Sequence, residues 1–295
     1  DNAKSIEGYF SLTSIHNVDT NGSDKYSILT IASLLAWGLG YFGMPHILLR
    51  FMAVENKQKI KTSRRIASIW VVISMGIAIF IGFIGNALTG KGSIAALEGS
   101  DSERIVIKIA QFMSENHAAL AIIAGLVFAG ILACTMSTSD SQLLAASSSM
   151  SENILKGVFK INMNEKKSML TARAALVVIA ILSVIIAWDQ NSSVFRVVSF
   201  AWAGFGATFG PVMLTALFWK RSNKYGAMAG MITGGVIVFV WKFGISKLGG
   251  AFAIYELLPA FVAALIVIII VSLCTSAPEK EITEQFESVK AELNK

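Results

Sequence analysis

Residues 36–51 read AWGLGYFGMPHILLRF, an apolar stretch that holds three glycines and a proline within eight positions: Gly38, Gly40, Gly43 and Pro45. Glycine and proline weaken the hydrogen-bonded ladder of a helix. Backbone groups freed at membrane depth are tolerated only beside a cavity, a substrate or an ion. The stretch therefore predicts a broken membrane helix with a binding site at the break. The alternative is a glycine-rich face for close packing with a simple proline kink. Trp37 and Tyr41 flank the break four positions apart and favour a pocket.

The composition of the whole chain indicates an all-α integral membrane protein. Of 295 residues, 54% are hydrophobic and 15% are charged, whereas an ordinary soluble domain carries about 25% charged residues. The apolar residues gather in runs close to the ~20 residues that a bilayer requires. These runs predict seven transmembrane helices, at 27–49, 66–88, 118–143, 172–188, 196–219, 227–245 and 256–275, of which the first is broken.

Charge predicts how the chain is oriented. Lysine and arginine concentrate in alternate connections, among them 50–65, 156–167 and 220–224. The positive-inside rule then makes 1–27 an external polar segment, 28–275 the transmembrane domain and 276–295 a cytoplasmic tail of a multi-pass cell-membrane protein. The net charge of +6 does not indicate nucleic-acid binding, because the basic residues flank spans. The polar start at Asp1 is no signal peptide, and we expect the sequence to begin inside a longer chain.

An amphipathic helix is predicted in the external connection at 102–115, SERIVIKIAQFMSE. Ser102 is the expected cap, and Ile105, Ile109, Phe112 and Met113 share one side. The helix is interpreted as a short lid, with a helix lying on the membrane surface as the alternative.

The third span carries a face of small polar residues. Within AGILACTMSTSDSQLLAASSSMSEN, residues 129–153, Cys134, Ser137, Thr138 and Ser141 recur at offsets of 0, 3, 4 and 7. Hydroxyl and carbonyl oxygens suit a hard monovalent cation such as sodium, although serine and threonine also bond back to their own helix. Asp140 strengthens the functional interpretation, because a carboxylate in a span is costly. A solvated or lysine-paired carboxylate is the alternative.

Three blocks of this sequence resemble the sodium:solute symporter family, in particular its proline permease branch. They are WGLGYFGMPHILLRFMA at 37–53, MSTSDSQLLAASSSMSEN at 136–153 and SFAWAGFGATFGPVMLTALFW at 199–219. The resemblance implies a LeuT-like fold, with spans one to five as the second inverted repeat and spans six and seven as two peripheral helices. The first repeat would precede this sequence.

The resemblance also implies a function and its residues. The function is sodium-coupled symport of a small solute, L-proline, by alternating access, with Na+ as the co-transported ion and the lipid bilayer as surroundings. The implied residues fall into three groups: substrate-binding Trp37, Tyr41 and Pro45; sodium-binding Cys134, through its carbonyl, with Ser137 and Thr138; and an outer gate at Trp202 and Phe205. The remaining sodium ligands would come from an earlier helix. The resemblance does not settle the role of Asp140. From its position at the edge of the hydroxyl face, Asp140 is predicted with Ser141 to form a second cation site or exit path, or a proton-sensitive gate.

Three other kinds of function are compatible with parts of the sequence. A sodium symporter of pantothenate, a sugar or another amino acid stays open. A seven-helix receptor is disfavoured, since the last span has no lysine for a retinal Schiff base. An enzyme is not expected: an intramembrane serine protease needs a base beside its nucleophile, and His16, His46 and His117 are not placed for that role.

Overall fold

The computed structural model describes residues 7–17, 22–188 and 193–293, and its contacts divide the chain into two units. Unit 1 is built from Glu55–Val194, and unit 2 from Ile6–Val54 with Phe195–Lys295. The predicted sodium-binding residues therefore belong to unit 1, whereas the predicted substrate-binding residues belong to unit 2. Each unit is described by itself.

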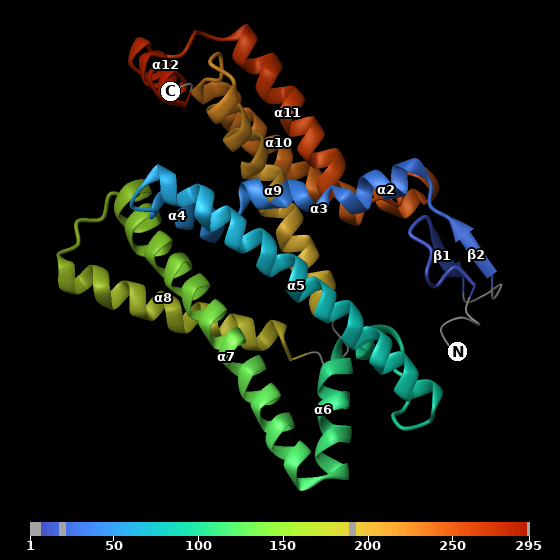
Figure 1. Ribbon diagram of the computed structural model, residues 1–295. Helices are drawn as coiled ribbons and strands as arrows, with labels where there is room; N and C mark the ends of the chain where they lie inside the picture. The colour runs from blue at the N-terminus through green and yellow to red at the C-terminus, as the bar shows by residue number, and fades with distance from the viewer. Residues whose placement is uncertain (1–6, 18–21, 189–192, 294–295) are drawn as a thin grey trace. The chain divides into compact units, whose positions relative to one another are not determined.

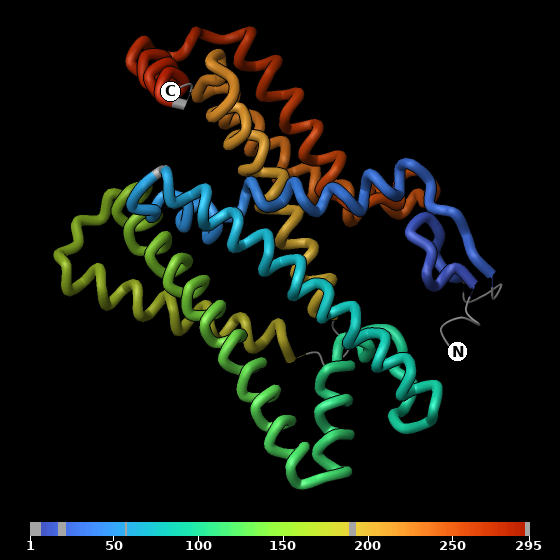
Figure 2. The backbone as a smooth tube through the Cα atoms, viewed as in Figure 1, coloured from blue at the N-terminus to red at the C-terminus, as the bar shows by residue number. Residues whose placement is uncertain are grey.

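Unit 1 is entirely helical in its described part (Figure 1). Its elements are α5 (Lys57–Gly90), the 3-10 helix η2 (Gly99–Arg104), α6 (Ile105–Asn116), α7 (Ala118–Ser148), the π-helix η3 (Ser149–Val158) and α8 (Glu165–Ile186). Asn56 caps α5, since its Oδ1 accepts a hydrogen bond from the backbone N–H of Gln58 at 2.8 Å. Figure 2 shows the chain reversing between α6 and α7, which pack side by side.

Unit 2 begins with a small hairpin and continues with the broken span. The hairpin pairs β1 (Ser14–Asn17) with β2 (Gly22–Lys25) in antiparallel register, His16 opposite Ser23. The remaining elements are α2 (Ile28–Leu35), α3 (Trp37–Gly40), η1 (Tyr41–Gly43), α4 (Pro45–Met52), α9 (Val194–Phe218), α10 (Lys224–Phe243), η4 (Ile245–Leu248), η5 (Gly250–Phe252), α11 (Leu257–Cys274) and α12 (Lys280–Leu293).

The core of unit 2 lies between α9, α10 and α11. Its fully buried side chains are small or aliphatic, among them Ala207, Val238 and Leu257. On α10, glycines recur every four residues, and a Cβ at Gly234 would lie 2.2 Å from the carbonyl oxygen of Ala207. Close backbone approach through such small residues is a common way for membrane helices to pack, because lipid gives little hydrophobic drive for their association. Figure 1 shows α10 and α11 running alongside each other.

Within the described residues, six helices are long and apolar enough to cross a membrane, and there are seven spans if the bent pair formed by Ile28–Gly43 and Pro45–Met52 is one span. The prediction of a multi-pass, mainly helical membrane protein is confirmed at this level. The inverted repeat and the two peripheral helices stay predictions.

Four local features differ from the sequence-based expectations. The β1–β2 hairpin adds strands to a fold expected to be all helical. Ser102 does not cap α6: its hydroxyl donates to the Gly99 carbonyl inside η2, and Arg104 precedes α6. The third span runs past 143, because the serines after Leu144 are polar yet keep helical hydrogen bonding through Ser148. The tail forms α12, whose charged residues suppressed any hydropathy signal. The expected external segment 1–27 and tail 276–295 lie partly outside the described residues, at 1–6, 18–21 and 294–295.

Candidate substrate and sodium sites

The first predicted span is broken at Met44. Its first part closes with the single 3-10 turn of η1, Met44 is extended with φ −80° and ψ 113°, and Pro45 opens α4. The two parts are bent by 51°. An extended residue before proline is expected, because the proline ring clashes with a helical conformation of its predecessor, and the missing N–H costs nothing at the first helical position. The break read from residues 36–51 is confirmed.

A carbonyl of the broken span accepts a hydrogen bond from another helix. The indole Nε1 of Trp202, on α9, donates a hydrogen bond to the carbonyl oxygen of Trp37 at 3.0 Å. Trp37 opens α3, in the part of the span that precedes the break. The Trp202 hydrogen bond therefore ties this part of the span to α9.

The glycines of the broken span divide into two groups. A Cβ at Gly40 would lie 2.0 Å from Trp202 Nε1, and one at Gly43 would lie 2.3 Å from the carbonyl oxygen of Phe205. A Cβ at Gly38 would meet nothing within 4 Å. Close packing, the alternative considered from the sequence, is thus right for Gly40 and Gly43. It accompanies the break instead of replacing it.

Five rings gather where the broken span meets α9 and the start of α11, and we call them the aromatic cluster: Trp37, Tyr41, Phe195, Trp202 and Tyr255. The Trp37 ring is nearly parallel to Phe195, Trp202 and Tyr255, with centroid separations of 5.5, 5.4 and 5.9 Å. Tyr41 meets Trp202 edge to face at 4.8 Å and is 51% exposed. Such pairs contribute about 0.5–1.5 kcal/mol beyond their burial. The cluster forms an apolar surface on the broken span, and the rings of Tyr41 and Phe195 are its exposed members.

The other predicted residues of unit 2 lie beside this cluster along the chain. Pro45 is exposed at the first position of α4, where it shapes the bend. Phe205 is 45% exposed and stacks on Phe209 at 6.2 Å, while its carbonyl oxygen lies against Gly43. The structure thus brings Trp37, Tyr41 and Trp202 into direct contact.

The predicted sodium-binding residues lie together on α7. Cys134, Ser137 and Thr138 are exposed within unit 1. Across the residues that the structure describes, no hydrogen bond involves the hydroxyl of Ser137 or Thr138. Those two oxygens are free to coordinate a cation, and a monovalent hard ion suits hydroxyl and carbonyl donors.

Asp140 and Ser141 continue along α7. The Ser141 hydroxyl donates to the Ser137 carbonyl at 3.0 Å, so it follows the back-bonding alternative. The Asp140 side chain is exposed, and in the described chain no ion pair includes it. The helix continues well beyond Asp140, so the carboxylate does not sit at a helix end.

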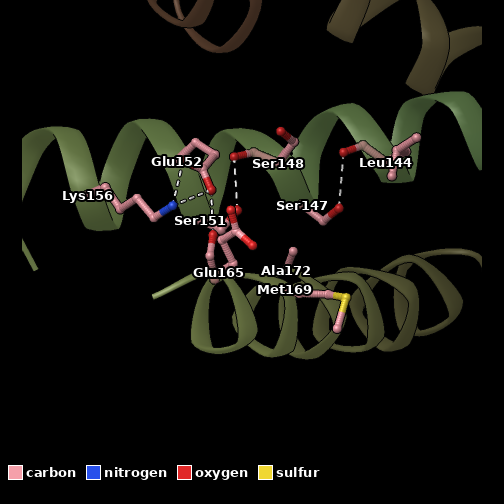
Figure 3. Close-up of a pocket in the computed structure, with 10 residues that line it drawn as sticks. Leu144, Ser147, Ser148, Ser151, Glu152, Lys156, Glu165, Met169 and Ala172 are labelled. Carbon is pink, nitrogen blue, oxygen red and sulfur yellow. Dashed lines mark hydrogen bonds and ion pairs between the residues drawn. The ribbon is translucent and has the colours of Figure 1, made fainter. Parts of the chain in front are cut away.

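An open cavity of about 360 Å³ lies farther along, between η3 and α8 (Figure 3). Glu152 and Lys156 form an ion pair at 2.8 Å, and the Ser168 hydroxyl of α8 donates to Glu152. Ser147 and Ser151 are buried and donate to carbonyls of their own helix. Most of these polar groups bond within α7 and η3, and the Ser168–Glu152 hydrogen bond joins α8 to η3. None of the predicted site residues lines the cavity.

Known proteins match this chain over most of its length. The model of the sodium:solute symporter family matches residues 5–234. The chain belongs to that family.

Several curated members of the sodium:solute symporter family are similar to this chain. The Sodium/proline symporter of Haemophilus influenzae is 43% identical over 89% of this chain and 51% of its own length. The High-affinity proline transporter PutP of Bacillus subtilis is 41% identical over 88% and 52%, and the Sodium/proline symporter of Escherichia coli is 36% identical over 94% and 53%. The chain spans about half the length of these relatives. No solved structure matches it significantly.

The sequence-based prediction missed two members of the aromatic cluster. Phe195 and Tyr255 each precede a predicted span or lie at its start, where a single aromatic residue carries no periodic signal. Ser33 was also missed, although it is buried and accepts a hydrogen bond from the backbone N–H of Tyr255. All three depend on contacts between segments far apart in sequence.

Proposed function

We propose that this protein imports L-proline together with sodium by alternating access. The observation that carries the proposal is the aromatic cluster at the broken span, where Trp37, Tyr41 and Trp202 meet. Membership of the sodium:solute symporter family and relatives named as proline transporters support the same function.

The chemistry of the cluster suits a small zwitterion with an apolar ring. Trp37 and Tyr41 would contact the pyrrolidine ring, and backbone groups at the break between Tyr41 and Pro45 would bind the charged head of the solute. Broken helices in transporters use their half-helix ends in this way. Trp202 and Phe205 would form the outer gate, because both lie on the face of α9 that meets the broken span.

Sodium would bind to the Cys134 carbonyl and the hydroxyls of Ser137 and Thr138. The free hydroxyls support this assignment, since neither is committed to a protein acceptor within the described chain. Three oxygens do not complete a cation site, and we propose that the remaining ligands come from outside this sequence. Asp140 and Ser141 would border the path by which sodium leaves.

We further propose a LeuT-like arrangement in which α2 to α9 form the second repeat and α10 and α11 are peripheral. The N-terminus would be outside and α12 in the cytoplasm, because the basic connections alternate. Ser222→Cys should then resist an impermeant thiol reagent added outside, and Ile94→Cys should react with it. The reverse labelling pattern would contradict the orientation.

The function is tested by uptake of labelled proline into membrane vesicles containing the protein expressed from its complete gene. We expect uptake to require an inward sodium gradient and to be competed by unlabelled proline, but not by pantothenate or sugars. Uptake driven by a proton gradient and indifferent to sodium would reject sodium coupling. Competition by another solute alone would reassign the substrate.

A further inference from the structure

Tyr255 is attached to three separate segments of unit 2. It precedes α11, and its hydroxyl donates a hydrogen bond to the Ser199 carbonyl of α9 at 2.7 Å. Its backbone N–H donates to the Ser33 hydroxyl of α2 at 2.8 Å. Its ring lies nearly parallel to Trp37 of α3, at 5.9 Å between centroids and 19° between planes. One residue at the start of α11 therefore contacts the broken span twice and α9 once.

The base of Tyr255 is itself well anchored. The next residue but one, Leu257, is fully buried in the core between α9, α10 and α11. Glu256 is buried and pairs with Lys242 of α10 at 3.2 Å. Burial and the neighbouring Glu256 carboxylate raise the pKa of the Tyr255 hydroxyl above its usual value. The backbone and the hydroxyl of Tyr255 are both held, so its ring has one orientation. The Trp37 ring that packs on it is thereby oriented as well.

We infer that Tyr255 is a positioning residue: it fixes the Trp37 ring from the side of α11 and so sets the affinity of the solute site. The inference rests on the proposed function, and it extends that function to a helix that the proposal treats as peripheral. Tyr255 itself is not placed against the solute. It acts through Trp37, which Phe195 and Trp202 approach as well.

The obvious alternative is that Tyr255 merely docks α11. Docking would affect the amount of folded protein and the maximal uptake rate together, without changing one substrate's affinity. Positioning would raise the proline concentration for half-maximal uptake and leave sodium affinity unchanged, because the sodium-binding residues lie on α7. Tyr255→Phe separates the two, since it keeps the ring and removes only the hydroxyl that donates to Ser199.

The first test compares Tyr255→Phe with Tyr225→Phe in the protein expressed from its complete gene. Tyr225 is a matched control, because its ring is 47% exposed at the start of α10. One hydrogen bond lost from Tyr255 should raise the half-saturating proline concentration about threefold to tenfold, with maximal rate and half-saturating sodium unchanged. Ser33→Ala should shift proline affinity in the same direction. Equal behaviour of the two tyrosine variants, or a loss confined to the maximal rate, would overturn the inference.

The second test does not depend on transport. Incorporating 5-fluorotryptophan gives each tryptophan a fluorine resonance, and Trp37→Phe and Trp202→Phe assign two of them. In Tyr255→Phe we expect the Trp37 resonance to shift or broaden, while those of Trp70 on α5 and Trp219 after α9 stay in place. An unmoved Trp37 resonance would overturn the positioning role. A moved resonance in a protein that does not import proline would reject the proposed function instead.

Discussion

The broken span of unit 2, which carries the predicted substrate-binding residues, and the continuous helix α7 of unit 1, which carries the predicted sodium-binding residues, satisfy their backbones in opposite ways. The broken span lacks a complete helical ladder, and it is held by partners elsewhere in unit 2: Trp202 bonds its Trp37 carbonyl, and Gly43 packs on the backbone of α9. The helix α7 satisfies its own backbone, and Ser137 and Thr138 stay exposed on it.

The difference shows where a binding site must be supported by tertiary structure. A break exposes peptide groups that cost several kcal/mol each if left unsatisfied in lipid, so other segments must approach it closely. A hydroxyl on an intact helix needs no partner from another segment. It can bind a ligand, or it can donate a hydrogen bond to a carbonyl of its own helix, as Ser141 does. Substitutions should therefore damage folding at the break and ion affinity on α7.

The largest effect is expected from Gly43→Ala, compared with Gly38→Ala in the same span. The new Cβ at position 43 would lie 2.3 Å from a backbone oxygen, which cannot rotate away, whereas position 38 has open space. Overpacking of this kind costs about 1–3 kcal/mol. Thermal stability in detergent and proline uptake should both fall for Gly43→Ala and stay near the parent for Gly38→Ala. Equal stability of the two variants would contradict the packing of the break on α9.

A narrower effect, on sodium affinity alone, is expected from removing one hydroxyl of α7. Ser137→Ala or Thr138→Ala should raise the half-saturating sodium concentration about tenfold or more, because a hydrogen-bond-like contact to a charged partner contributes ~1.5–3 kcal/mol. Ser139→Ala is the control, since it removes a hydroxyl from the other side of the helix. Unchanged sodium dependence in both test variants would make them packing residues.

Trp202→Phe tests the tertiary bond at the break more gently than a new Cβ does. It keeps an aromatic ring but leaves the Trp37 carbonyl without its donor, 3.0 Å away in the parent. Losing a hydrogen bond of about 1 kcal/mol should weaken proline affinity about fivefold and leave sodium affinity unchanged. Trp70→Phe on α5, where the ring is exposed, should change neither. A change confined to sodium affinity would contradict the assignment of the solute site to the broken span and of the sodium site to α7.

Asp140→Asn should have a smaller effect, because the carboxylate is exposed beside the proposed exit path. Exposed charges contribute about 0.2–1 kcal/mol, which corresponds to a change of up to about fivefold. We expect slower sodium release on the cytoplasmic side or an altered sodium-to-proline ratio, with solute binding retained. Flux measurements of both substrates at several pH values check this. Parent-like fluxes would leave Asp140 a solvated side chain.

The smallest effect concerns α12, which lies outside the site. Lys220 donates a hydrogen bond to Glu287 at 2.6 Å and thereby lowers the pKa of that carboxyl below its usual 4.5. Because the pKa of Glu287 is lowered, the ion pair stabilises the docked α12 fully at pH values above the usual pKa of 4.5. This contribution is lost as the pH falls through the lowered pKa. Hydrogen exchange of α12, corrected for intrinsic rates, should rise slightly on acidification in the parent. In Glu287→Gln that pH dependence should be missing.

The sequence alone determined what is local or periodic in this protein. Long apolar runs predicted the membrane helices, since about 20 apolar residues cross a bilayer and a helix satisfies its own backbone groups in lipid. The break at Met44 followed from Gly43 and Pro45, whose backbone preferences act within one turn. The helical repeat predicted that Cys134, Ser137 and Thr138 share one face. Three blocks of sequence indicated the sodium:solute symporter family.

Only the tertiary structure decided which distant segments support the break. Trp202 could be suspected of a role at a gate, but its bond to the Trp37 carbonyl depends on how α9 lies against the span. Tyr255 and Ser33, 222 positions apart, meet because α11 starts beside α2. Hydrogen-bond geometry of this kind is fixed by packing of whole helices, and a single polar or aromatic residue near a span end carries no periodic trace of its partner.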